Sequence, residues 1–380
     1  SAPQRIAPGL DRGLQQIEWG ADGRSIVAAY EQEGSVTVAR IGLDGRVAPL
    51  TVNAGGGGLD RPYAGGEFSL ARNGAIAFTA DSPGRPADVM VGRGGNDLRR
   101  LTELNQTTLS AKALGGLTPL EVRAPDGLRI PAWVLVPAGY KQDKPLPAIL
   151  EIHGGPYAAY GPHFSTDYQL YNAAGYAVIY ANPRGSTGYG QAFADGIEKT
   201  YPASNFDDLM AAVDAAVAAG IADPNNLFVT GGSGGGILTA WIIGKTDRFK
   251  AAASQKPVIN WTSMALTSDG PQFFGPYWMG SQPWENYQAY WARSPLSLIG
   301  NVKTPTLVVV GSEDYRTPVS ESEQLYTALK LKGVPTMLVK VPGASHSFAN
   351  RPSQSAAKAS AITAWFDRYR TPPVPPPSGQ

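Results

Sequence analysis

Cysteine is absent from this sequence of 380 residues. Its absence excludes disulfide bonds, thiolate metal sites and a cysteine nucleophile, but leaves both a cytoplasmic and a periplasmic location open. Histidine is scarce: the chain has three, His153, His163 and His346. A metal site built from several histidines would need nearly all of them, so we expect no metal and no cofactor. Any imidazole base must be one of these three.

An excess of charge of one sign is also missing. Lys and Arg number 32 and Asp and Glu 31, which gives a formal net charge of +1. This balance argues against a nucleic-acid partner, which requires a basic surface, and against an acidic disordered chain. No apolar run reaches the roughly 18 residues of a transmembrane helix, and the first residues lack the apolar core of a signal peptide. We expect no membrane span, and a signal peptide, if one is encoded, has been removed.

Glycine and proline, in contrast, are abundant, with 45 and 32 residues. Together they form about a fifth of the chain, below the roughly 25–30% that indicates low complexity, and they predict many tight turns. At about 100–200 residues per domain, the length predicts two domains, or three. The character of the sequence changes near residue 117, and residues 371–380 form a proline-rich tail that we expect to be extended or disordered.

Residues 1–117 carry the signals of an all-β segment. Short apolar runs alternate with the turn pairs Asp22-Gly23 and Asp44-Gly45, which are typical of β-hairpins. Part of the pattern recurs, because Gly23 corresponds to Gly74 and Leu50 to Leu101, an offset of 51 residues in both cases. That period is close to the roughly 40–50 residues of a four-stranded propeller blade, so the segment predicts about two blades. Two blades cannot close a ring, and a small β-sandwich is the alternative.

Residues 118–370 predict a second domain in which strands and helices alternate. The strands are continuous apolar runs, which favours a doubly wound, mostly parallel sheet with helices on both faces. The expected strands are 128–136, 147–152, 176–180, 227–229, 251–253, 306–310 and 336–341. The expected helices are 205–219, 237–243, 320–331 and 353–369. The segment 261–299 interrupts the alternation and is rich in aromatic residues.

The motif with the most chemical information is Gly231-x-Ser233-x-Gly235, followed by Gly236. It lies between a predicted strand and a predicted helix, as in the nucleophile elbow of α/β-hydrolases. Glycine costs about 0.8–1 kcal/mol relative to alanine inside a helix, so a run of glycines at a helix start requires a reason. Alternatives are a flexible turn or a glycine-rich phosphate-binding loop, but the Gly-Lys-Ser/Thr of a P-loop is missing.

A serine nucleophile needs a base and an acid that orients it, in the chain order serine, acid, histidine for this fold. His346 is the only histidine after Ser233, and it follows the last predicted strand. Two acids, Glu313 and Asp314, follow the preceding strand, and we favour Asp314. Arg316 could brace this loop or form an ordinary surface ion pair, which is worth about 0–1 kcal/mol.

The oxyanion that forms during attack requires two hydrogen-bond donors. One is expected to be the backbone N–H of Gly234, the residue after the nucleophile. The other is expected from the loop His153-Gly154-Gly155-Pro156, which follows an earlier predicted strand. We expect a structural rather than a catalytic role for His153, and neither role for His163.

At this point the sequence resembles the prolyl oligopeptidase family of serine peptidases, in particular its acylaminoacyl-peptidase-like branch. The resemblance covers roughly residues 119–370. The matching residues are the His153–Pro156 loop, the run Asn-Pro-Arg-Gly-Ser-Thr-Gly-Tyr-Gly from Asn182 to Gly190, the Ser233 elbow, Asp314 with Arg316 and Pro318, and His346. The Asn182–Gly190 run separates this family from other serine hydrolases.

The resemblance implies an α/β-hydrolase domain capped by a β-propeller that selects substrates by size. It implies Ser233 as nucleophile, Asp314 as acid, His346 as base, and the N–H groups of Gly155 and Gly234 as the oxyanion hole. Two features depart from the family. Most of the propeller is missing, so this chain looks like a piece or a processed form of a longer protein that contains the rest; the alternative is that the gene encodes only these residues. Gly234 also stands where relatives often carry an aromatic residue.

Three functions remain open at this stage. The first is a serine peptidase that acts on short peptides through an acyl-enzyme, with Phe273, Phe274, Tyr277 and Trp278 either lining a substrate pocket or packing as the core of a lid. The second is a carboxylesterase with the same triad, and the third is a catalytically silent binding module. Acyl-peptide release, dipeptide release, internal cleavage and isopeptide cleavage all remain open, as does the oligomeric state.

Overall fold

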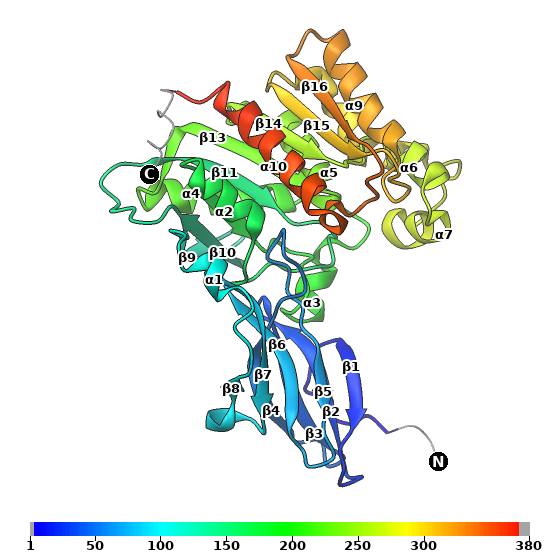
Figure 1. The fold of residues 1–380 in the computed structure, drawn as a ribbon. Coiled ribbons are helices and arrows are strands. Elements are labelled where there is room, and N and C mark those ends of the chain that lie inside the picture. Colours follow the sequence, from blue (N-terminus) through cyan, green and yellow to red (C-terminus); the bar gives the residue numbers. More distant parts are fainter. Residues whose placement is uncertain (1–3, 372–380) are drawn as a thin grey trace. The chain divides into compact units, whose positions relative to one another are not determined.

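The computed structural model describes residues 4–371. The chain forms two compact units (Figure 1). Unit 1 comprises Ser1–Gly116, Ala158–Thr166 and Ser186–Asp195, and unit 2 comprises Leu117–Tyr157, Asp167–Gly185 and Gly196–Gln380. Two short segments that interrupt the second unit in sequence therefore belong to the first. Residues 372–380, most of the predicted proline-rich tail, lie outside the described residues.

Unit 1 contains two four-stranded antiparallel sheets with the same sequential strand order. The first consists of β1 (Leu14–Trp19), β2 (Ser25–Gln32), β3 (Ser35–Gly42) and β4 (Val47–Ala54). The second consists of β5 (Phe68–Leu70), β6 (Ile76–Ser82), β7 (Arg85–Gly92) and β8 (Arg99–Arg100). Each sheet is a propeller-like blade, so the all-β prediction is confirmed. The short α1 (Gln106–Leu109) and α3 (Gln191–Ala194) also belong to this unit.

The hairpin turns of unit 1 form where the sequence predicts them. Gly23 and Gly45 adopt positive φ angles of 60° and 86°, which glycine tolerates without steric cost. The aspartate before each glycine accepts backbone hydrogen bonds from the other side of its turn, as Asp22 does from Ser25 N at 3.1 Å. Apolar side chains of both sheets form one core: Val27, Ala29, Val36, Val38, Ala54, Phe68, Ile76 and Phe78.

Unit 2 is built on one sheet of eight strands in the order β16-β15-β14-β13-β11-β12-β10-β9. The strands are β9 (Gly116–Arg123), β10 (Arg129–Val136), β11 (Leu146–Ile152), β12 (Ala177–Ala181), β13 (Ala222–Gly232), β14 (Ala251–Gln255), β15 (Thr306–Gly311) and β16 (Thr336–Val341). The six strands from β12 to β16 in this order pair in parallel, and β10 is antiparallel to β12. The prediction of a mostly parallel sheet is confirmed.

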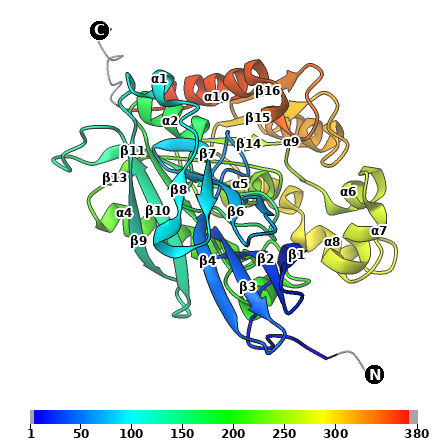
Figure 2. The same cartoon turned by 60° about the horizontal axis from the view of Figure 1, so that its bottom comes forward.

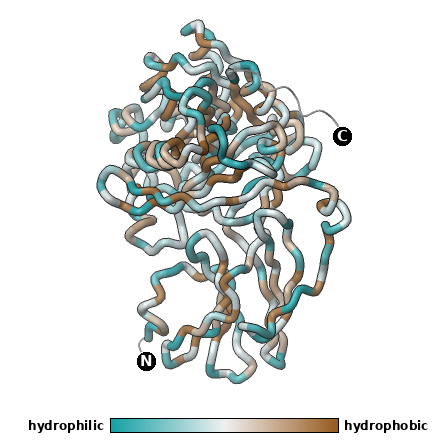
Figure 3. Tube along the Cα trace, turned by 90° about the vertical axis from the view of Figure 1, so that its left-hand side faces the viewer, coloured by the Kyte–Doolittle hydropathy of each residue, from teal (hydrophilic) through white to brown (hydrophobic). Residues whose placement is uncertain are grey.

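Helices cover both faces of this sheet, with α10 in front of it and α5 behind it in Figure 1. The helices are α2 (Thr166–Ala173), α4 (Asn205–Ala218), α5 (Gly234–Lys245), α6 (Trp261–Thr267), α7 (Pro271–Phe273), α8 (Tyr287–Arg293), α9 (Val319–Leu331) and α10 (Pro352–Asp367). Hydrophobic stretches gather in the interior of the unit (Figure 3), and every residue of β12, β14 and β15 is buried. Double coverage explains why these strands are continuously apolar.

Several elements were not predicted. Most residues of the edge strand β9 are exposed or half-buried, so the strand lacks a clear apolar pattern. Helix α2 buries polar residues, among them Asp167 and Asn172, and so lacks a simple apolar stripe. The aromatic segment forms the short helices α6, α7 and α8, which lie together in Figure 2. Within residues 4–371, no helix combines the length and apolar character that crossing a membrane requires.

Candidate active site

Ser233 lies at the sharp turn between β13 and α5. Its backbone has φ 60° and ψ −119°, a conformation that residues other than glycine rarely adopt. Two backbone hydrogen bonds hold it there: Ser233 N donates to Gln255 O at 3.1 Å, and Ile237 N donates to Ser233 O at 3.0 Å. Strain of this kind persists where the surrounding structure imposes it, often at functional sites. The turn has the form of the predicted nucleophile elbow.

The glycines around Ser233 are required by close packing. A Cβ atom on Gly235 would lie 2.0 Å from the carbonyl oxygen of Ile152, and one on Gly236 would lie 2.3 Å from that of Gln255. The start of α5 therefore packs directly against the ends of β11 and β14. This packing supplies the reason that the glycine run required.

Gly234 and Gly155 bring two backbone segments into direct contact. A Cβ atom on Gly234 would lie 2.8 Å from the carbonyl oxygen and 3.0 Å from the backbone nitrogen of Gly155. Gly155 itself has φ +120°, which favours glycine. Gly234 is also the first residue of α5, where backbone N–H groups lack partners within the helix. A larger residue at position 234 would displace the Gly155 loop.

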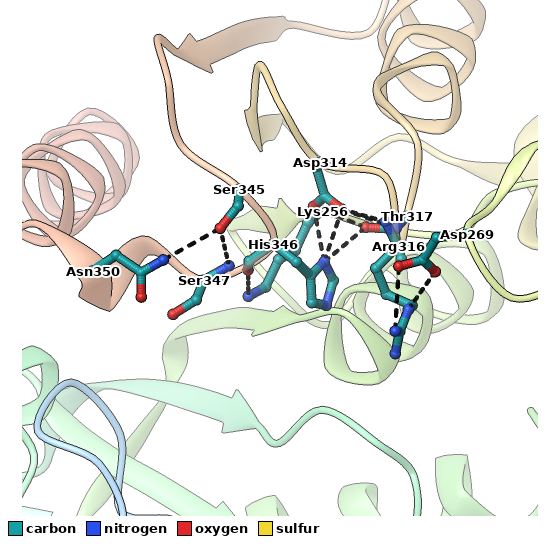
Figure 4. Close-up of polar contacts among 9 residues, drawn as sticks. All are labelled: Lys256, Asp269, Asp314, Arg316, Thr317, Ser345, His346, Ser347 and Asn350. Atoms are coloured by element: carbon teal, nitrogen blue, oxygen red, sulfur yellow. Dashed lines mark hydrogen bonds and ion pairs between the residues drawn. The ribbon is translucent and has the colours of Figure 1, made fainter.

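Asp314 and His346 form the hydrogen-bonded pair of the site (Figure 4). They follow β15 and β16, and parallel strands end at one edge of a sheet. His346 Nδ1 lies 2.8 Å from Asp314 Oδ2 and 3.0 Å from Oδ1. The Asp314 side chain is fully buried and accepts further hydrogen bonds from the backbone N–H groups of Arg316 and Thr317. The neighbouring Glu313 is exposed.

The contact with Asp314 is made by Nδ1 of His346, so the second imidazole nitrogen, Nε2, is the one that could take part in proton transfer. When Nδ1–H donates to the carboxylate, Nε2 carries a lone pair and can accept a proton. Burial lowers the pKa of His346, the hydrogen bond to Asp314 raises it, and the charge of Lys256 lowers it, so that the pKa is lowered in total. His346 is therefore neutral at pH 7. Within residues 4–371, no hydrogen bond joins His346 to Ser233; such contacts are often long in structures without substrate.

Comparisons with known proteins identify the family of the chain. Residues 162–372, more than half of the chain, match the model of the prolyl oligopeptidase family. The chain belongs to the prolyl oligopeptidase family. The uncharacterized peptidase YuxL of Bacillus subtilis is 35% identical over 369 residues, which cover 96% of this chain and 55% of that protein. The acylamino-acid-releasing enzyme of Arabidopsis thaliana is 30% identical over 393 residues, which cover 95% of this chain and 50% of the enzyme.

Solved structures of the family share the fold. The acylaminoacyl peptidase of Pyrococcus horikoshii aligns with a TM-score of 0.85 and 26% sequence identity, over 96% of this chain and 57% of that one. The chain thus spans about half the length of the relatives it matches.

In this member of the prolyl oligopeptidase family, the other two histidines, His153 and His163, are buried and hydrogen-bonded. His153 is buried, and its Nδ1 donates to the carbonyl oxygen of Gly154 at 2.7 Å. Burial lowers the pKa of His153 to about 4, so the ring is neutral at pH 7. His163 belongs to unit 1, where it contacts Asp81.

Arg316 forms an ion pair near the site. Its Nε lies 2.7 Å from Asp269 Oδ1, and the backbone N–H of Asp269 donates to the carbonyl oxygen of Tyr315. Both side chains of the ion pair are about half exposed, so solvent screens it and about 0–1 kcal/mol is expected from it. The contact joins the acid loop to the segment that follows α6.

The four predicted pocket residues divide into two pairs. Phe274 is buried and Trp278 half-buried, and their rings lie 5.5 Å apart. Trp278 also packs against Trp261, so this pair belongs to an aromatic core. Phe273 and Tyr277, in contrast, are 46% and 67% exposed, and their stacked rings lie 5.4 Å apart.

Three residues near the site were missed by the sequence analysis. The hydroxyl of Thr317 donates to Asp314 Oδ2 at 3.2 Å, and the hydroxyl of Tyr201 donates to the carbonyl oxygen of Gly234 at 2.7 Å. Lys256 donates to the carbonyl oxygen of His346. Only Lys256 offered a signal, because it follows a predicted strand at the edge where functional residues of parallel sheets gather.

Proposed function

We propose that this chain carries the catalytic centre of a serine peptidase that hydrolyses short peptides through an acyl-enzyme on Ser233. The observation that carries the proposal is the buried Asp314 carboxylate on His346 Nδ1, in a chain whose elbow holds Ser233. Nucleophile, acid and base follow one another in the chain order of α/β-hydrolases.

The reaction assigns one task to each group. Ser233 Oγ attacks the carbonyl carbon while its proton passes to His346 Nε2, and the imidazolium then gives this proton to the departing amine. Water hydrolyses the acyl-enzyme by the same two proton transfers and restores the serine. Asp314 keeps His346 in the required tautomer and stabilises the imidazolium.

The oxyanion hole that we propose consists of the backbone N–H groups of Gly155 and Gly234. Their backbones approach each other as closely as residues without side chains allow. Donors fixed in advance of the reaction stabilise the negative charge of the tetrahedral intermediate, and each contributes about 2.7–4 kcal/mol in comparable enzymes.

Two observations support the proposed substrate class: the family of the chain and the exposed aromatic rings of Phe273 and Tyr277. Family membership supports peptides as substrates. The exposed stack of Phe273 and Tyr277 is suited to an apolar side chain of the peptide, because exposed aromatic faces gain free energy when an apolar group covers them. We propose that this stack belongs to the substrate pocket. Phe274 and Trp278 instead pack in the aromatic core of the segment.

The test compares this chain with its Ser233→Ala variant. A peptide-library digest read by mass spectrometry identifies the cleaved bonds, and a fluorophosphonate probe reports the reactive serine. We expect cleavage and labelling by the wild type, and a loss of about 10⁶-fold in kcat for Ser233→Ala. Cleavage that persists in the variant would contradict the proposal.

The two alternative functions predict other outcomes of the same experiment. A carboxylesterase would hydrolyse an aryl ester but cleave no member of the peptide library. A silent binding module would fold, as judged by circular dichroism, without Ser233-dependent labelling. Turnover of a peptide anilide by the wild type alone would separate the peptidase from both.

A further inference from the structure

Lys256 is a buried cation beside the proposed base. It follows β14 directly, and the residue is only 7% exposed. Its Nζ donates to the carbonyl oxygen of His346 and lies 5.6 Å from the centre of the Phe348 ring, within the range of a cation–π contact (Figure 4 shows the first contact). Both partners belong to the loop after β16, so the Lys256 side chain contacts the loop that carries the proposed base at two points.

The backbone around Lys256 contacts the other two catalytic segments. The carbonyl oxygen of Gln255 accepts a hydrogen bond from Ser233 N at 3.1 Å. Lys256 N donates to the carbonyl oxygen of Val309 at 2.6 Å, on the strand that leads to Asp314. Two consecutive residues therefore connect the elbow, the acid strand and the base loop.

The conformation of Lys256 indicates that these contacts are imposed. Its φ is +40°, in the left-handed region that residues other than glycine, asparagine and aspartate rarely adopt. A strained backbone at a residue with a long side chain persists only where its surroundings fix it. Here a hydrogen bond from the backbone and another from the side chain do so.

We propose that Lys256 is a positioning residue for catalysis, which holds the main chain of His346 in register with Ser233 and Asp314. This inference rests on the proposed function, since it requires His346 to act as the base. The contacts of its ammonium group described above are with the main chain of His346 and the ring of Phe348. Removal of its ammonium group releases the loop, and a displacement of about 1 Å in a catalytic group can cost about 10²-fold in rate.

Electrostatics gives the proposal a signature that a purely structural role lacks. The charged groups that act on His346 are Asp314, Lys256 and Arg316. Asp314 raises the pKa of the imidazole, whereas Lys256 and Arg316 lower it. Loss of the Lys256 charge therefore raises the pKa of His346, so the acid limb of the kcat/KM profile moves to higher pH.

The experiment uses the full chain with Lys256→Met, Lys256→Gln and a control, Lys245→Met. Lys245 is exposed and lies over the rings of Phe206 and Trp241, so its variant also removes a cation–π contact, but at the far end of α5. Hydrolysis of a peptide p-nitroanilide is measured between about pH 5 and 9, together with thermal unfolding.

We expect kcat to fall about 10- to 100-fold in Lys256→Met, with KM changed less and the acid limb at higher pH. Lys256→Gln retains a donor for His346 O, so we expect the same direction of shift in the acid limb with a smaller loss of kcat. Lys245→Met should match the wild type in both. An acid limb and kcat unchanged in either folded Lys256 variant would overturn the inference.

Failure of this inference is distinguishable from failure of the proposed function. If Ser233→Ala removes activity while the Lys256 variants match the wild type, only the role of Lys256 is wrong. If Ser233→Ala retains activity, the proposed function itself is wrong. A Lys256→Met protein that does not fold leaves the decision to Lys256→Gln.

Discussion

The two units each contain a histidine paired with a buried aspartate, and the pairs differ in one respect. In unit 1, His163 Nδ1 lies 2.6 Å from Asp81 Oδ1, and its Nε2 lies 2.7 Å from the carbonyl oxygen of Gly34. In unit 2, His346 Nδ1 contacts Asp314, while the side chain remains 31% exposed. Both pairs join an imidazole to a carboxylate, but in residues 4–371 the hydrogen bonds of the His346 ring are at Nδ1, whereas both nitrogens of His163 have a partner.

The difference shows that a histidine–carboxylate pair alone does not indicate catalysis. Both ring nitrogens of His163 lie within hydrogen-bond distance of an oxygen, Nδ1 of the Asp81 carboxylate and Nε2 of the Gly34 carbonyl, so the ring is held between two partners. Asp81 also accepts from the backbone N–H of Phe164, which fixes the segment that contains His163. We interpret the pair in unit 1 as a latch and the pair in unit 2 as a base with its orienting acid.

The largest effect that separates the two pairs is expected from matched aspartate substitutions. Asp314→Asn leaves the size of the side chain unchanged but favours the wrong tautomer of His346, so we expect kcat to fall by about 10⁴-fold. Asp81→Asn should leave kcat within about threefold of the wild type, because the hydrogen bonds of Asp81 described above are with His163 and Phe164 of unit 1. Steady-state kinetics on folded protein measures both, and equal losses would remove the distinction.

A second comparison measures stability instead of kcat. Here we expect the larger effect at the His163 pair of unit 1 and the smaller one at the His346 pair of unit 2. His163→Gln removes one partner of a buried hydrogen-bonded pair, and we expect the free energy of unfolding to fall by about 1–3 kcal/mol. His346→Gln affects a partly exposed ring, so a loss of only about 1 kcal/mol is expected. Urea unfolding monitored by circular dichroism tests both; a smaller loss in His163→Gln than in His346→Gln would contradict the latch.

The last comparison concerns the third histidine, His153, and the dependence of stability on pH. Burial lowers its pKa from 6.5 to about 4, so the folded protein holds this ring neutral. As the pH falls below 6.5, the unfolded chain binds a proton that the folded chain does not, and stability decreases until about pH 4. The contribution of His153 that is lost over this window is at most about 3 kcal/mol.

The measurement compares urea unfolding at about pH 7 and pH 5 in the wild type and in His153→Gln. Glutamine does not titrate, so the variant should lose less stability between the two pH values than the wild type does. An identical decrease in both proteins would show that other groups control this dependence.

Local signals in the sequence were sufficient for much of the fold and for the order of the site. The turns at Gly23 and Gly45 depend on neighbouring residues only, since an aspartate and a residue that accepts positive φ define them. Apolar runs such as Thr306–Gly311 predict buried strands because they must be covered on both faces. The glycine pattern around Ser233 predicts the elbow for the same kind of local reason.

Tertiary structure decided what depends on distant residues. Sequence left Glu313 and Asp314 as alternatives, and only the folded loop shows that Asp314 is the one in contact with His346. It also left Lys256 unnoticed, because its partner His346 lies 90 residues further along the chain. Residues 158–166 and 186–195 belong to unit 1 although residues of unit 2 flank them in the sequence.

By itself, then, the sequence determined the α/β architecture, the all-β segment and the succession of Ser233, an acid and His346, because turns, strand periodicity and chain order are written in neighbouring residues. The tertiary structure decided which carboxylate contacts which histidine, and that Asp314 contacts His346 at Nδ1. Hydrogen bonds form between atoms close in space, and only the folded backbone brings Asp314 to His346 and Gly34 to His163.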